Sequence, residues 1–332
     1  MSLPRAPAFW RDDGVAARLL APLGALTGAL AQRRLRRESP RPALPAIVVG
    51  GLTAGGDGKT PTAIALARLL VAEGERPALL TRGYGRRDAR ASPFAVDATA
   101  SPDRTGDEAL LLARHGLTIV GADRAASAKL ARDMGATALI LDDGFHSRRI
   151  APDFSFLVVD SHYGAGNGRC APAGPLRAPL AAQFAAADAL IVIGDGAAAA
   201  ALMATAEKPA FRARLRAQPA AQTWSGRRVV AFAGIGRPEK FFRTLENVGA
   251  ELVARRAFPD HHRFSARDLD RLATLARRHE ARLVTTEKDV VRLPEGATEV
   301  DVLPVRLVFD DADAVAAALA ARLSAARLSR VS

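Results

Sequence analysis

The sequence predicts an α/β protein with a P-loop-type, doubly wound, mostly parallel sheet, a second and smaller α/β domain, and an N-terminal amphipathic helix. Three observations support this fold class. The apolar run at 46–49 leads into a glycine-rich turn that ends in Gly-Lys-Thr at 58–60, as in a phosphate-binding loop. Short apolar runs then alternate with helical patterns as far as residue 206, which is typical of a parallel sheet. A fresh strand–turn–helix pattern begins after Gly226 and indicates the second domain.

The amino-acid composition limits the kinds of protein and of binding partner that are compatible with this sequence. The 332 residues, 49% of them hydrophobic, can fill the core of one large or two ordinary domains. The single cysteine, Cys170, excludes an intramolecular disulfide and favours a reducing, cytoplasmic compartment. A formal net charge of +12 indicates a polyanionic partner, which could be nucleic acid, an anionic membrane surface or a phosphorylated substrate. Aromatic content of only 5% argues against binding of single-stranded nucleic acid by base stacking.

The N-terminal segment, 1–40, is predicted to precede a nucleotide-binding core at 41–206 and a smaller domain at 207–332. Its apolar stripe is Leu19, Leu23, Leu26 and Leu30, and its basic end is Arg33, Arg34, Arg36 and Arg37. Arg18 and Pro22 interrupt the stripe, so a transmembrane helix is not predicted. The helix either packs on the body of the protein or lies in a membrane interface with Trp10 at its boundary. At about 1 kcal/mol for each arginine near anionic lipid, the basic end supplies about 4 kcal/mol, near a thousandfold in partitioning.

The turn after the first apolar run has the layout of a P-loop. Backbone N–H groups of its small residues can surround a phosphate, Lys59 can reach the β- and γ-phosphates, and Thr60 can bind Mg²⁺. The first glycine of the usual motif is Thr53 in this chain, and a purely structural glycine turn is the alternative. The predicted nucleotide-binding residues here are Thr53, Ala54, Gly55, Gly56, Asp57, Gly58, Lys59 and Thr60.

Polar residues recur at the ends of the strands that follow. The patterns predict a helix at 61–72, strands at 78–80, 118–120, 156–160 and 189–193, and helices at 109–114 and 197–206. A basic turn at 82–86 follows the first of these strands, where ligands bind in open α/β sheets. Asp107 precedes a helix, where a carboxylate is either catalytic or simply favourable with the helix dipole. Arg124 begins the next helix.

Asp142 and Asp143 end a buried strand at 138–143, as the acidic residue near Mg²⁺ does in P-loop proteins. Two buried like charges are costly without a cation, so a metal or catalytic role is predicted for this pair.

The smaller domain is predicted to contain strands at 229–233, 283–289 and 302–309, and helices at 238–245 and 312–323. Ser265 and Asp268 can cap a further helix that runs towards Arg278. His261 and His262 follow Asp260, but their spacing fits no common zinc site. A proton-transfer or orienting role is predicted, with an ordinary surface loop as the alternative.

Together these stretches resemble the tetraacyldisaccharide 4′-kinases, the lipid A 4′-kinases of Gram-negative bacteria. The stretches that carry the resemblance are Gly51 to Pro61, Arg82-Gly83-Tyr84-Gly85-Arg86, Gly106-Asp107-Glu108, Leu141-Asp142-Asp143-Gly144-Phe145, Pro172 to Arg177, Ala231 to Gly236, Phe258 to His262 and Thr285-Thr286-Glu287-Lys288-Asp289. The family tolerates a residue other than glycine at the position of Thr53. In one place this chain departs from the family, because His146-Ser147 stands where the family usually has Gln-His.

The resemblance implies transfer of the ATP γ-phosphate to the 4′-hydroxyl of a tetraacyldisaccharide 1-phosphate, by a peripheral (monotopic) protein at the cytoplasmic face of the inner membrane. ATP and Mg²⁺ are the implied cofactors. Asp107 matches the catalytic base and His261 the histidine that supports it. Thr60 and Asp142 are assigned to the metal, Asp143 to the catalytic centre and Arg124 to phosphate. An aspartate with a pKa near 4 is a weak base, so the histidine would orient it or raise its proton affinity.

The expected partners are the lipid substrate and the anionic inner-membrane surface, with no nucleic acid and no obligate protein partner. Because Asp107 and His261 fall in different predicted domains, the active site is expected in an interdomain cleft. Two other functions stay open. One is a soluble P-loop ATPase or ATP-dependent small-molecule enzyme whose N-terminal helix packs internally. The other is a nucleic-acid-binding regulator, which only the charge favours.

Overall fold

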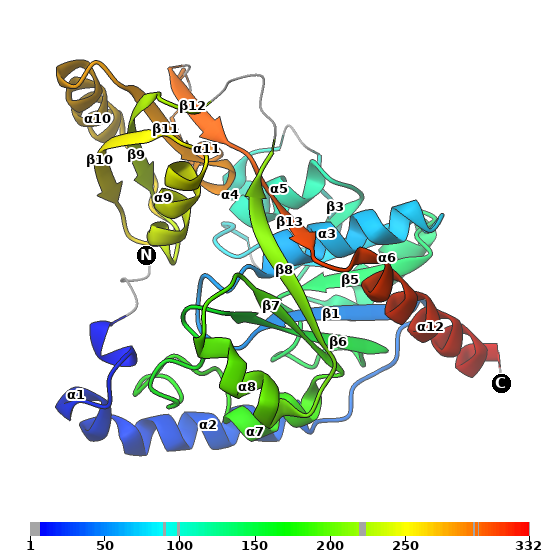
Figure 1. The fold of residues 1–332 in the computed structure, drawn as a ribbon. Coiled ribbons are helices and arrows are strands. Elements are labelled where there is room, and N and C mark those ends of the chain that lie inside the picture. The colour runs from blue at the N-terminus through cyan, green and yellow to red at the C-terminus, as the bar shows by residue number, and fades with distance from the viewer. Residues whose placement is uncertain are drawn as a thin grey trace. The chain divides into compact units, whose positions relative to one another are not determined.

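The computed structural model describes residues 7–88, 91–97, 100–218, 224–294, 296–297 and 299–331. The chain divides into two compact units (Figure 1). The larger unit is Ala8–Arg214 with Leu307–Ser332, and the smaller has Leu215–Arg306 as its main segment. The chain therefore leaves the larger unit after Arg214 and returns to it at Leu307.

A nine-stranded sheet in the order β13-β8-β7-β6-β1-β5-β2-β4-β3 forms the centre of the larger unit. The strands are β1 (Ala46–Gly51), β2 (Pro77–Thr81), β3 (Phe94–Ala95), β4 (Thr118–Val120), β5 (Ala138–Asp142), β6 (Phe154–Asp160), β7 (Ala189–Ile193), β8 (Ala210–Ala217) and β13 (Val305–Phe309). From β8 to β4 the neighbours pair in parallel, and β3 pairs antiparallel with β4. Parallel pairing brings the carboxyl ends of β1, β5 and β2 to one edge, where the site lies.

Helices cover both faces of this sheet. They are η1 (Ala8–Trp10), α1 (Val15–Leu19), α2 (Ala21–Leu35), α3 (Lys59–Ala72), α4 (Pro102–Thr105), α5 (Asp107–Ala113), α6 (Arg124–Asp133), α7 (Leu180–Ala186), α8 (Ala198–Ala206) and α12 (Ala312–Val331). One core joins alternate strand residues to α2, α6, α7 and α8. The intervening strand residues face the other way, where α3 and α5 pack on the sheet and α12 packs on α3. The predicted α/β fold with a doubly wound, mostly parallel sheet is confirmed.

The smaller unit has its own parallel sheet in the order β10-β9-β11-β12. Its elements are β9 (Arg228–Ala233), α9 (Pro238–Asn247), β10 (Glu251–Ala257), α10 (Ala266–Arg278), β11 (Arg282–Thr286), α11 (Glu287–Val290) and β12 (Val300–Leu303). Helix α9 shares one apolar core with the sheet and α10 shares another. Ser265 and Asp268 form the predicted capping box at the start of α10.

The predicted strand at 302–309 is wrong, because the chain forms two strands there, β12 and β13, in different sheets. Pro304 separates them, since proline has no N–H to continue a ladder. The chain after 306, predicted to belong to the smaller domain, returns to the larger unit because β13 joins β8 and α12 packs on α3. The chain first passes from the larger to the smaller unit after Arg214, whereas this boundary was predicted after residue 206. Helix α12 also continues to Val331, past the predicted end at 323.

Candidate active site

The loop between β1 and α3 has the backbone of a phosphate-binding site. Gly55, Gly56 and Gly58 have positive φ angles of 79°, 69° and 98°, and α3 begins at Lys59. Such a turn directs successive N–H groups into one concavity, and the first turn of the helix adds positive potential there. The geometry therefore agrees with the predicted P-loop.

Thr53 and Asp57 brace this loop from inside. Asp57 accepts hydrogen bonds from the Thr53 hydroxyl (2.5 Å) and from the Thr53 backbone N–H (2.8 Å), and both side chains are buried. A Cβ atom added at Gly51 would lie 2.5 Å from Asp57 Oδ2. Thr53, which replaces the first glycine, thus anchors the loop, and the Asp57 carboxylate supports the shape of this predicted phosphate-binding loop.

Replacing Asp57 by alanine is expected to raise the KM for ATP by about tenfold, because a buried hydrogen bond to a charged group contributes about 1.5–3 kcal/mol. Steady-state kinetics with Mg-ATP would measure it. Asp133→Ala, at an exposed carboxylate on α6, is the matched control and should leave the KM unchanged. An unchanged KM for ATP in Asp57→Ala would contradict the role of Asp57 in stabilising the loop.

Thr60 and Asp142, both predicted to bind metal, are brought together. The Thr60 hydroxyl donates to Asp142 Oδ2 at 2.8 Å. Asp142 Oδ1 is buried and accepts no hydrogen bond in the described part of the chain. Burial raises the pKa of Asp142 to about 7, and the negative charge of Glu108 acts in the same direction. A hydroxyl and an unsatisfied carboxylate oxygen are suitable ligands for Mg²⁺, which is commonly completed by phosphate oxygens and water.

Binding of Mg²⁺ should depend on pH through Asp142. Below a pKa of about 7 the carboxyl is protonated, and the cation must displace that proton. The apparent affinity for Mn²⁺, a spectroscopic substitute for Mg²⁺, is expected to rise about tenfold per pH unit at acidic pH and to level off above neutrality. Electron paramagnetic resonance titration would measure this. Asp142→Asn should lower the affinity and flatten the profile; a flat wild-type profile would contradict the prediction.

Asp143 is surrounded by cations. Both terminal guanidinium nitrogens of Arg177 donate to its carboxylate, with 3.1 Å between Arg177 Nη2 and Asp143 Oδ2. Lys59 Nζ lies 3.8 Å from Asp143 Oδ1. Burial tends to raise the pKa of Asp143, but Lys59 and Arg177 outweigh it and hold that pKa far below its usual value. A carboxylate of low proton affinity is a poor general base. The contacts instead suit Asp143 to orient Lys59 and Arg177.

Arg177 was not among the predicted site residues, although it ends one of the family-like stretches. The chain just before it pairs with the P-loop: Ala54 N–H donates to the Pro175 carbonyl at 2.8 Å, and Leu176 forms a bridge with Thr53. The sequence signal that could have identified Arg177 was its place in the family-like stretch Pro172–Arg177. Glu108 was also missed, although its charge acts on Asp142 and on Arg177.

Arg124 and Asp107 were also predicted to belong to the site. Arg124, the first residue of α6, is 4% exposed, and its Nη1 atom has no hydrogen-bond partner among the described residues. Burial lowers its pKa to about 10, while the charges of Asp142 and Asp143 act to raise it. Asp107 begins α5, after a Gly106 that packs against the turn following β2. Because β2 lies beside β5, this turn is at the same sheet edge as Asp142.

His146, at the departure from the family pattern, is a buried neutral side chain. Its Nε2 atom lies 2.9 Å from Gln183 Oε1, and Gln183 donates to the carbonyl groups of Leu52 (3.2 Å) and Ala178 (2.7 Å). Burial, with the positive charge of Arg177, lowers the pKa of His146 to about 3. His146 therefore supports the residue that precedes the P-loop. Ser147 donates to the Gly144 carbonyl, within the turn.

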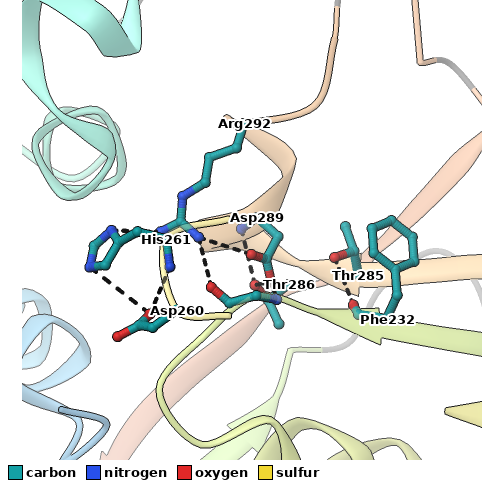
Figure 2. Close-up of polar contacts among 8 residues, drawn as sticks. Phe232, Asp260, His261, Thr285, Thr286, Asp289 and Arg292 are labelled. Carbon is teal, nitrogen blue, oxygen red and sulfur yellow. Dashed lines mark hydrogen bonds and ion pairs between the residues drawn. The ribbon is translucent and has the colours of Figure 1, made fainter. Parts of the chain in front are cut away.

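His261 lies in the smaller unit, in a structured turn after β10 (Figure 2). Its φ angle is 59°, and its backbone N–H donates to the Gly234 carbonyl at 3.0 Å. Its Nδ1 atom is 3.2 Å from Arg292 Nη2. The neighbouring His262 stacks on Phe258 at 4.7 Å between ring centroids, so the two histidines have different surroundings. In the described ranges no group of three or more His, Cys, Asp or Glu side chains could hold a metal.

Similar proteins agree on one family. The family model for tetraacyldisaccharide-1-P 4′-kinase matches residues 16–324. A tetraacyldisaccharide 4′-kinase of Methylobacterium nodulans is 52% identical, covering 97% of this chain and 96% of the relative. One from Paramagnetospirillum magneticum is 50% identical, covering 92% and 95%. The fold matches a crystal structure of "apo" form LpxK from Aquifex aeolicus in complex with ATP, with a TM-score of 0.70, 24% identity, and coverage of 92% and 99%. The chain belongs to the tetraacyldisaccharide-1-P 4′-kinase family.

Proposed function

We propose that the protein transfers the γ-phosphate of ATP to the 4′-hydroxyl of a tetraacyldisaccharide 1-phosphate in lipid A biosynthesis. The observation that carries the proposal is the contact of Thr60 with Asp142 beside a P-loop, in a chain of this family. Phosphoryl transfer requires positioning and neutralisation of charge more than an elaborate nucleophile. A cationic phosphate loop and an oxygen-ligand pair for Mg²⁺ supply both requirements.

Each site residue then has a role. Thr60 and Asp142 would hold Mg²⁺, which would supply positive charge to neutralise the phosphates. Lys59 and Arg124 bind phosphate oxygens, and Asp143 keeps Lys59 in place. Asp107 accepts the proton of the acceptor hydroxyl. The family resemblance assigns the support of this proton transfer to His261.

The decisive experiment incubates the purified protein with Mg-ATP and acylated disaccharide 1-phosphate in mixed detergent micelles. Phosphate should appear on the 4′-hydroxyl, as judged by mass spectrometry of the product. Lys59→Met, which removes the charge at the γ-phosphate, is the control and should abolish transfer. If phosphate were transferred only to a water-soluble acceptor, the protein would be a soluble small-molecule kinase instead.

We also propose that α1 and α2 lie in the surface of an anionic membrane. Ala17, Gly24, Gly28 and Leu35 form the buried side of these helices, and Gly28 packs closely against Cys170. The predicted leucine stripe is on the other side: Leu19, Leu23, Leu26 and Leu30 are 76%, 54%, 59% and 49% exposed. Such an apolar face beside exposed arginines is typical of an interfacial helix. None of the described helices combines the length and the apolar character that a membrane span requires.

A further inference from the structure

The core of the smaller unit contains an ion pair that reaches His261 (Figure 2). The side chains of Arg292 and Asp289 are 1% and 0% exposed and are joined by a 3.0 Å contact between Nη1 and Oδ1. Arg292 Nη1 also donates to the Gly234 carbonyl at 2.9 Å. Asp289 Oδ2 accepts from the Gly234 N–H at 3.1 Å and from the Thr286 hydroxyl at 2.7 Å. A buried charge pair satisfied in this way holds the guanidinium in one position.

The second terminal nitrogen of Arg292 contacts the imidazole ring. Arg292 Nη2 lies 3.2 Å from His261 Nδ1. A guanidinium can only donate, so Nδ1 must accept, and the proton of the neutral ring is then on Nε2. The backbone of His261 is held by the same turn, since its N–H donates to the Gly234 carbonyl at 3.0 Å and to Asp260 Oδ1 at 3.1 Å. These contacts hold the ring in one direction and favour the tautomer that is protonated at Nε2.

We propose that Arg292, held by Asp289, is a positioning residue that keeps His261 as a neutral donor through Nε2–H. The proposal rests on the proposed function of His261 in phosphoryl transfer. A donor of this kind can orient an anionic oxygen through Nε2–H. It cannot take up the proton of the acceptor hydroxyl at Nε2, which is already protonated. Protonation at Nδ1 would break the bond to Arg292 and place two cations side by side. His261 therefore donates through Nε2 and does not store a proton.

The tautomer can be read directly from the wild-type protein labelled with ¹⁵N-histidine. Long-range ¹H–¹⁵N correlation spectra distinguish a protonated from an unprotonated ring nitrogen, and the spectrum of His261→Gln identifies the signals of His261. We expect an unprotonated Nδ1 and a protonated Nε2 at neutral pH. A protonated Nδ1, or a mixture of tautomers, would overturn the proposal. This measurement needs neither substrate nor a substitution at Arg292.

Kinetics then test the positioning role. Arg292→Met should lower kcat by about ten- to a hundredfold and leave the KM for ATP unchanged. This loss is a part of the about 10²–10⁴-fold that a positioned acid–base group contributes to the rate. Arg292→Lys retains the positive charge next to Asp289 but has only one side-chain nitrogen, so it cannot reproduce the separate contacts of Nη1 with Asp289 and of Nη2 with His261. It should therefore recover part of that loss. Thr285→Val is the matched control, because it removes another buried hydrogen bond of this unit, from Thr285 to the Phe232 carbonyl at 2.9 Å, without touching His261. Its kcat should stay close to wild type.

Testing Arg292→Met in a His261→Gln protein distinguishes a failure of the positioning role of Arg292 from a failure of the proposed function of His261. In His261→Gln, adding Arg292→Met should cause no further loss of kcat, because Arg292 acts through His261. A further loss of the full size would overturn the positioning role. If His261→Gln itself kept the wild-type kcat, the proposed function of His261 would fail first. Should Arg292→Met not fold, the comparison of Arg292→Lys with Thr285→Val decides in its place: equal kcat values would reject the proposal.

Discussion

Asp107→Ala is expected to lower kcat by about 10²–10⁴-fold while the KM for ATP changes little, because a positioned general base contributes that much and acts mainly in the transition state. Asp107 begins α5 at the sheet edge that carries the P-loop, and the neighbouring Glu108 already influences the pKa of Asp142. Initial rates in mixed micelles, with ATP and lipid varied separately, would give both constants. His261→Ala should show the same pattern with a smaller loss of kcat.

The control for this experiment is Asp103→Ala. Asp103 lies on the preceding short helix, α4, and pairs with the exposed Arg87, so its loss removes a carboxylate from the same stretch of chain. Its kcat should equal that of wild type. If Asp107→Ala instead raised the KM for ATP and kept kcat, Asp107 would belong to nucleotide binding.

Replacing Leu19, Leu23, Leu26 and Leu30 together by glutamine is expected to weaken binding to anionic vesicles by about a thousandfold. Each leucine is about half to three-quarters exposed, so burying the remaining surface in lipid contributes about 1 kcal/mol per residue, or about 4 kcal/mol in all. Co-sedimentation with phospholipid vesicles that contain an anionic lipid would measure the loss. Because the four side chains are exposed in the folded protein, the melting temperature should stay near that of wild type.

Val71→Gln combined with Leu328→Gln is the matched control for the leucine stripe. Both side chains are exposed apolar groups of the larger unit, at 58% and 73%, but neither lies on α1 or α2. This double variant should bind vesicles as wild type does. Wild-type binding by the fourfold leucine variant would refute the interfacial role of α1 and α2 and favour the alternative of a soluble enzyme.

Much of the fold could be predicted because each strand of the parallel sheet is a short apolar run with a clear stop. The strands predicted at 118–120 and 189–193 match β4 and β7 residue for residue. Strands β8 and β10 were missed, since arginine occupies 212, 214 and 216 in one and 255–256 in the other. In β8 the alternation of these arginines with Phe211, Ala213 and Leu215 was the signal, and it has the period of two that indicates a strand.

Local pattern was sufficient for the parts of the protein that are short in sequence: the α/β class, the P-loop with Lys59 and Thr60, and the carboxylates that end β5. These features arise from neighbouring residues, whose types and spacing are visible along the chain. Other parts depend on contacts between segments that are distant in sequence. These are the return of β13 and α12 to the larger unit, the hydrogen bonds from Arg177 to Asp143, and the contact of Arg292 with His261. The burial and partners of a polar side chain, which decide its charge and its tautomer, exist only when the chain is folded.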